Sequence, residues 1–233
     1  TTEIYTLSLH DALPIYPDLG DSHPFPDVDI FRQDLQTGET RLVSVNADLP
    51  GPEGSRGNQL PVISADGRYV AFVSDQTGFV PGETLDDGDG DDDVFLHEVA
   101  TGHTERVSVT ADGAPGDGWS DVAAVTADGR SVVFTSSATN LVPGDDNGVA
   151  DVFVRDLVAG TTTLVSVGDD GRRGDGAARS GRVTPDGQVV VFTATGSGLV
   201  PGDHNGTWDT LVRNRTEART TRVSVPTGGG TRP

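Results

Sequence analysis

A segment that begins with aspartate returns four times along the chain, and this repeat restricts the possible folds more than any other feature. A Val-Ser-Val triplet follows each copy, and Asp-Gly and Val-Pro-Gly markers recur between the copies in a constant order. The copies begin at Asp29, Asp93, Asp151 and Asp209, and the triplets are centred on Ser44, Ser108, Ser166 and Ser224. Such self-similarity at a fixed period is typical of tandem structural units.

Each repeat has the pattern of four short strands. In the last copy, Arg182–Thr184 leads into a tight turn at Asp186-Gly187. Gln188–Thr193 follows as a β-branched run typical of a strand buried on both faces. Asp209–Asn214 and Thr220–Val225 complete the unit. An Asp-Gly pair between two such runs is a strong hairpin signal, and no window has the 3.6-residue period of a helix.

Four-stranded antiparallel units in tandem predict an all-β fold, a β-propeller. Residues 27–233 form the propeller region, with about three and a half blades: a half blade at 27–45 and whole blades at 59–109, 121–167 and 182–225. Propellers usually close with about four to eight blades. We therefore expect a fragment of a larger, six- to eight-bladed ring.

The opening segment, residues 1–26, is expected to lie outside the blades. Thr1–Tyr16 resembles the translated adapter read-through that heads some metagenomic fragments, and the chain starts without Met. We expect a truncated reading frame, in which a missing signal peptide carries no information.

Two loops account for the length of the repeat. Leu199–Trp208 connects the second and third strands, and Gly168–Ser180 connects two blades. Because successive strands alternate in direction, both loops are expected on one face of the propeller. The tight turns occupy the opposite face, so the long-loop face is the predicted functional face.

Three stretches resemble the TolB-like propeller repeats of bacterial envelope and secreted proteins: Ser64–Ser74, Val142–Val154 and Thr163–Val167. The resemblance extends from about Asp27 to Val225. It implies a periplasmic or extracellular protein. Such blades occur in scaffolds, in binding proteins and in accessory domains of enzymes.

An acidic pattern, D-x-[DN]-G-x-x-D, occurs three times in the loops between the second and third strands. Calcium prefers six to eight hard oxygen ligands, and alternating acidic positions before a glycine provide them in the first half of an EF-hand loop. The candidate metal ligands are Asp87, Asp89 and Asp93; Asp145, Asn147 and Asp151; and Asp203, Asn205 and Asp209. Ca²⁺ is the only cofactor that we expect.

The same pattern is also that of an ordinary turn. Asp and Asn hydrogen-bond locally to the backbone, and glycine adopts a positive φ. The bidentate Glu of a complete EF-hand loop is missing. The sequence therefore leaves two interpretations open, a calcium site and a turn.

The charge and the composition exclude several classes of partner. The formal net charge is -20, which disfavours nucleic acid and anionic lipid. No run approaches the roughly 18 apolar residues of a membrane span. The chain has no Cys, which excludes disulfides and zinc–thiolate sites. Oligomeric state is not indicated.

No catalytic residues are predicted, because the histidines are scattered and no G-x-S-x-G elbow occurs. Trp119 and Trp208 do not repeat and fall in long loops, where they could hold a sugar or a peptide. We expect a non-enzymatic module that binds a protein or glycan partner through the long-loop face. The alternatives are an accessory propeller of a larger hydrolase or lyase, and a purely structural repeat protein.

Overall fold

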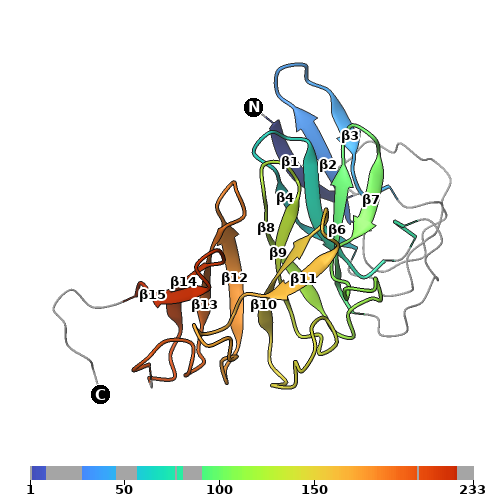
Figure 1. Cartoon of the computed structure of the whole chain (residues 1–233). Helices are drawn as coiled ribbons and strands as arrows, with labels where there is room; N and C mark the ends of the chain where they lie inside the picture. The colour runs from blue at the N-terminus through green and yellow to red at the C-terminus, as the bar shows by residue number, and fades with distance from the viewer. Residues whose placement is uncertain are drawn as a thin grey trace.

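The protein is an assembly of β-sheets and loops, as the sequence predicts. The computed structural model describes residues 2–8, 28–45, 57–76, 78–80, 91–203 and 205–224. Within these ranges every regular element is a β-strand (Figure 1). The described residues accordingly include no helix that is long and apolar enough to cross a membrane.

Three four-stranded sheets follow one another along the chain, and all of their strands pair antiparallel in sequence order. The second sheet of the chain contains β4 (Asn58–Ile63), β5 (Tyr69–Ser74), β6 (Asp93–Glu98) and β7 (His103–Arg106). The third contains β8 (Ser120–Val125), β9 (Ser131–Ser136), β10 (Asp151–Asp156) and β11 (Thr161–Leu164). The fourth contains β12 (Ala178–Val183), β13 (Val189–Ala194), β14 (Asp209–Asn214) and β15 (Arg219–Arg222).

The sheets are arranged as consecutive propeller blades (Figure 1). The first strands of the three sheets, β4, β8 and β12, lie beside one another, and each sheet extends outward from this inner strand. The predicted hairpin turns are present, with Gly67, Gly129 and Gly187 at φ of about 70°. The predicted fold class is confirmed.

The first sheet has three strands, and one of them comes from the segment expected to lie outside the blades. β1 (Thr2–Ser8) pairs with β2 (Val28–Asp34), which pairs with β3 (Thr40–Leu42). The expectation for residues 1–26 is therefore wrong for this strand. β1 occupies the place that β5 has in the second sheet, where it satisfies the backbone groups along the edge of β2.

The first strand of the last blade begins earlier than predicted, at Ala178 rather than Arg182. A register shift lies between Arg179 and Arg182, and similar shifts interrupt β4 and β8. A bulge disrupts the two-residue period by which a strand is recognised in a sequence. Gly181 in this bulge is required, because a Cβ there would lie 2.5 Å from a methyl group of Val133 in the neighbouring blade.

Phenylalanines fill the space between the blades. Phe134 and Phe153 are fully buried, stack with ring centroids 5.5 Å apart and pack against Val73 and Val94 of the preceding sheet. Phe72 and Phe95 of the second sheet make the same contact towards Ile30 of the first sheet. The recurring phenylalanines are thus core residues, as predicted.

The opposite face of each sheet carries valines, which pack on the following blade. Val133 and Val165 are 0% and 2% exposed because Phe192 of the fourth sheet covers them. Their counterparts in the fourth sheet, Val191 and Val223, are 36% and 51% exposed. The prediction that this β13 run is buried on both faces is therefore wrong: in the described part of the chain no further sheet covers the second face.

Candidate functional site

An aspartate at the start of β2, β6, β10 and β14, the equivalent strands of the four sheets, is held by the serine of the Val-Ser-Val triplet. In each blade the serine lies 15 residues after the aspartate, and its Oγ donates a hydrogen bond to the Oδ1 of that aspartate. The O···O distances are 2.8 Å for Ser44–Asp29 and 2.5 Å for Ser108–Asp93, Ser166–Asp151 and Ser224–Asp209. The same Oγ accepts the next backbone N–H of the third strand.

This Asp–Ser bridge gives two of the sequence markers a structural role that the sequence analysis missed. It connects the start of the third strand to the end of the fourth and satisfies polar groups that would otherwise be buried unpaired. Asp93, Asp151 and Asp209 were predicted as metal ligands, and each uses one of its carboxylate oxygens in this bridge. The constant 15-residue spacing of Asp and Ser was the available signal.

In the fourth blade the loop acids surround an arginine. Arg222 Nη1 lies 3.1 Å from Asp203 Oδ1 and 3.4 Å from Asp209 Oδ2. Asn205 Nδ2 donates to Asp209 Oδ2 at 3.0 Å. Burial alone would raise the pKa of Asp209, but the hydrogen bonds from Ser224 and Asn205 and the charge of Arg222 lower it overall. The carboxylates here are neutralised by the chain itself.

In the third blade no described arginine forms an ion pair with the equivalent acids, and Arg173 acts on them only through its nearby charge. Asn147 Nδ2 donates to Asp151 Oδ2 at 2.6 Å, and Asp151 is 1% exposed. Asp145 is 7% exposed. Burial and, after it, the neighbouring charge of Asp151 raise the pKa of Asp145 to about 6. This is the acid pair with the least compensated charge among the described loops.

In the second blade the acidic loop lies partly outside the described residues. Asp87 and Asp89, two of the predicted ligands, are among the residues that the structure does not describe. Asp93 is described, and its Oδ2 forms an ion pair with Arg106 Nη1 at 2.6 Å. Both side chains are less than a tenth exposed.

The described residues do not form a preorganised cluster of metal-binding side chains. Within the described ranges no three His, Cys, Asp or Glu side chains come together as a potential metal site. Any calcium site would need the Asn side chains and backbone carbonyls as further ligands. Calcium binding at the nine predicted residues stays a prediction.

Arg179 of the inner strand β12 lines one pocket with Trp119 and stacks on Trp208. Trp119 lines a pocket of about 650 Å³ together with Asp121, Arg179 and Arg182. Trp208, which is 48% exposed, stacks with its ring centroid 4.7 Å from the guanidinium carbon of Arg179. We refer to Trp119, Asp121, Arg179, Arg182 and Trp208 as the tryptophan groove. The sequence placed both tryptophans in long loops but could not show that Arg179 connects them.

The tryptophan groove contains charges of both signs. Burial raises the pKa of Asp121, and the nearby charge of Arg179 opposes this effect. Arg182 Nη1 donates to the backbone carbonyl of Ala123 at 2.7 Å, which fixes this guanidinium across two blades. The groove therefore combines exposed aromatic surface with fixed hydrogen-bonding groups, as ligand sites usually do.

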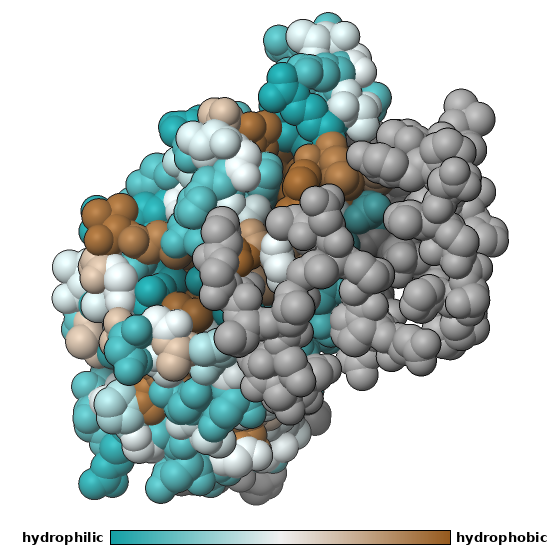
Figure 2. All heavy atoms as spheres, turned by 90° about the vertical axis from the view of Figure 1, so that its right-hand side faces the viewer, coloured by the Kyte–Doolittle hydropathy of each residue, from teal (hydrophilic) through white to brown (hydrophobic). Residues whose placement is uncertain are grey.

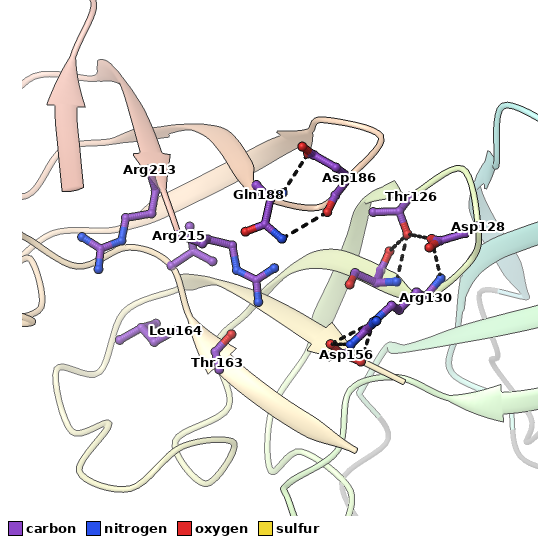
Figure 3. A pocket seen from close by; sticks show the side chains of 12 residues that line it. Thr126, Asp128, Arg130, Asp156, Thr163, Leu164, Asp186, Gln188, Arg213 and Arg215 are labelled. Atoms are coloured by element: carbon purple, nitrogen blue, oxygen red, sulfur yellow. Dashed lines mark hydrogen bonds and ion pairs between the residues drawn. The ribbon is translucent and has the colours of Figure 1, made fainter. Parts of the chain in front are cut away.

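A second pocket, of about 510 Å³, lies on the tight-turn face between the third and fourth blades (Figure 3). Its charged groups bind one another: Arg130 Nη2 lies 3.1 Å from Asp156 Oδ2. Arg215 Nη1 donates to Gly187 O at 2.8 Å. Because these groups already have hydrogen-bond partners within the chain, a ligand in this pocket would gain few new hydrogen bonds.

The described histidines do not form a catalytic centre. His97 is 5% exposed, and its Nδ1 lies 2.9 Å from Thr104 Oγ1. Burial lowers the pKa of His97. Its partner is a strand threonine that is itself buried, so His97 is a packing residue.

The raised pKa of Asp145 predicts a pH-dependent stability in the presence of a chelator. The native state holds this proton more tightly than the unfolded chain, so stability falls as pH rises from about 4 to about 6 and then levels off. Asp145→Asn should remove this dependence and gain roughly 1–2 kcal/mol above pH 6, allowing for solvent screening. Urea titrations at several pH values measure the difference, with Asp146→Asn, an exposed neighbour, as the control. Equal pH profiles for the wild type and Asp145→Asn would contradict the assignment.

Comparisons with known proteins agree on the fold. No protein-family model and no curated protein matches the chain. Among solved structures, the putative TolB from Agrobacterium tumefaciens matches with 16% identity and a TM-score of 0.51, covering 94% of this chain and 60% of that one. The β-propeller domain of the Trilobed protease from Pyrococcus furiosus matches with 11% identity and a TM-score of 0.50, covering 95% and 53%.

Dipeptidyl peptidase 4 from Porphyromonas gingivalis also matches, with 13% identity and a TM-score of 0.51, covering 88% of this chain and 29% of that one. The chain thus spans less than two thirds of each of these structures. At such identities a likeness shows the fold alone. The fold of this chain is therefore a run of β-propeller blades similar to those of TolB and of the propeller domains of peptidases.

Proposed function

We propose that the chain is a non-catalytic binding module that recognises a protein or glycan partner at the tryptophan groove. The observation that carries this proposal is that Arg179 of the fourth blade lines a pocket with Trp119 of the third blade and also stacks on the half-exposed ring of Trp208. On the face drawn in Figure 2 the described side chains are mainly hydrophilic, with several separate apolar patches. Exposed tryptophan beside arginine is the composition of binding hot spots.

The chemistry of the groove suits an amphipathic ligand. The indole faces provide apolar area for the C–H face of a sugar ring or for an apolar peptide side chain. Arg179 and Arg182 supply donors for hydroxyl, carbonyl or carboxylate oxygens, and Asp121 supplies an acceptor. The ordered backbone of the inner strands keeps these groups in place before binding, which limits the entropy cost of association.

The test uses the fluorescence of the only two tryptophans in the chain. Oligosaccharides and peptides are titrated into the full chain, and a ligand of the groove should give a saturable change in emission. Trp119→Ala should weaken the affinity for that ligand by roughly 30-fold, because a central aromatic contact contributes about 2 kcal/mol. Calorimetry measures the affinity of this variant independently of its fluorescence.

Val158→Ala is the matched control, since Val158 is 74% exposed and lies in the turn between β10 and β11, away from the groove. It should bind like the wild type. A ligand that binds Trp119→Ala and the wild type equally would place the binding surface elsewhere.

The second candidate function is that of an accessory propeller in a larger hydrolase or lyase. The matches to a propeller domain of a protease and to a dipeptidyl peptidase favour it. Sequencing the complete reading frame distinguishes the two, because an attached catalytic domain would support the accessory role. The likeness to TolB supports a periplasmic or extracellular location, which fractionation of the native host cells would test.

A further inference from the structure

One position on the fourth strand of each blade determines whether an arginine side chain reaches the aspartates of the acidic loop. Strand pairing sets Arg106 opposite Phe95, Leu164 opposite Phe153 and Arg222 opposite Leu211. The three positions are therefore equivalent in the second, third and fourth blades. Arg106 and Arg222 bring a guanidinium to the loop aspartates, whereas Leu164 packs into the apolar core beside Phe153.

In the third blade no guanidinium of the described residues forms an ion pair with the acids, although the nearby charge of Arg173 favours the ionised form of both Asp145 and Asp151. Asp145 is only 7% exposed, and among the described residues its carboxylate forms no hydrogen bond and no ion pair, although the carboxylate oxygens keep some contact with solvent. Its counterpart Asp203 is paired with Arg222 at 3.1 Å. Arg173 lies nearby but directs its Nη2 to the carbonyl of Pro143 at 2.9 Å. An unpaired buried carboxylate next to a second buried carboxylate is costly unless a cation joins them.

From this difference we propose that Asp145 and Asp151 bind one Ca²⁺ ion in the third blade, at the position that the Arg222 guanidinium occupies in the fourth. The free carboxylate of Asp145 and the Oδ2 of Asp151 are the first ligands. Asn147 now donates its amide to Asp151 Oδ2 and accepts from Val149 N through its Oδ1, and a rotation that exchanges these two hydrogen bonds for the metal turns the amide oxygen towards the ion. Carbonyl oxygens of the loop and water complete the oxygen-rich coordination that calcium requires.

The proposal narrows the predicted metal sites to one blade and does not rest on the tryptophan groove. In the fourth blade, where Arg222 pairs with both Asp203 and Asp209, these two acids need no metal. Where the chain supplies a leucine, the loop takes up a metal. The acidic loop of the second blade extends into undescribed residues, so calcium bound there is treated as a background common to all variants.

The experiment counts calcium ions per chain in the full-length protein, by calorimetry after complete chelation. Leu164→Arg supplies the guanidinium that the fourth blade has, and it should reduce the number of bound calcium ions by one relative to the wild type. Thr163→Arg adds the same charge one residue away, on the exposed side of β11, and should leave the number unchanged. Asp145→Asn should also lose one ion.

The reverse substitution provides a gain-of-site test. Arg222→Leu frees Asp203 and Asp209 and should add one calcium ion per chain. Circular dichroism confirms that each variant is folded, and Asp145→Asn decides the matter if Leu164→Arg does not fold. The proposal is overturned if folded Leu164→Arg or Asp145→Asn binds as many calcium ions as the wild type.

Discussion

Replacing Arg106 by leucine is expected to lower the free energy of unfolding by about 3–5 kcal/mol, the usual cost of removing one partner of a buried ion pair. Arg106 Nη1 lies 2.6 Å from Asp93 Oδ2, and the two side chains are 5% and 8% exposed. Without the guanidinium, Asp93 would keep a buried negative charge in an acidic loop. The Ser108 hydrogen bond to Oδ1 would remain but could not neutralise that charge.

The leucine itself should fit, because the third blade already has Leu164 at the equivalent position over Phe153. The loss is therefore electrostatic rather than steric. Urea unfolding at pH 7 measures it, and the double variant Arg106→Leu with Asp93→Asn should recover most of the stability. If the double variant is as unstable as the single one, the packing of Arg106 over the Phe95 ring, 5.4 Å away, carries the effect instead.

Much of the fold could be predicted because the same strand and turn pattern recurs in each repeat. The runs around Phe72, Phe134 and Phe192 each follow an Asp-Gly turn, so each copy of the repeat supports the strand assignment of the others. The inner strands were the exception. Arg179 and Gly181 interrupt the alternation of apolar and polar residues at a bulge, and the need for glycine arises from Val133 in another blade. A contact between two blades joins residues far apart in the sequence, so it produces no local sequence pattern from which it could be predicted.

The candidate sites could be predicted only in part, for a similar reason. The Asp-x-Asn-Gly loops were visible, but their partners Arg106, Leu164 and Arg222 lie on a different strand and do not form a motif. The Asp–Ser bridge shows that a residue with the identity of a metal ligand can be committed to the fold. Likewise, Trp119 and Trp208 are 89 positions apart, and only the packing of the fourth blade against the third brings them to one arginine.

Removal of the Phe153 ring should destabilise the protein about as much as loss of the buried ion pair. Phe153 is fully buried, stacks on Phe134 and contacts the apolar face of the second sheet. Phe153→Ala removes this area from the core and leaves a cavity between two blades, at an expected cost of about 3–5 kcal/mol. Thermal and urea unfolding measure the loss.

The repeat supplies a matched control in the same structural position. Phe31 of β2 is equivalent to Phe153, but its face points away from the second sheet, and its side chain is only half-buried. Phe31→Ala should therefore cost only about 1–2 kcal/mol, in proportion to the apolar area it covers. Such a difference would indicate that packing between blades contributes a large part of the stability. If both substitutions cost the same, each sheet would be stable by itself, and the packing of consecutive blades would not be what holds the chain together.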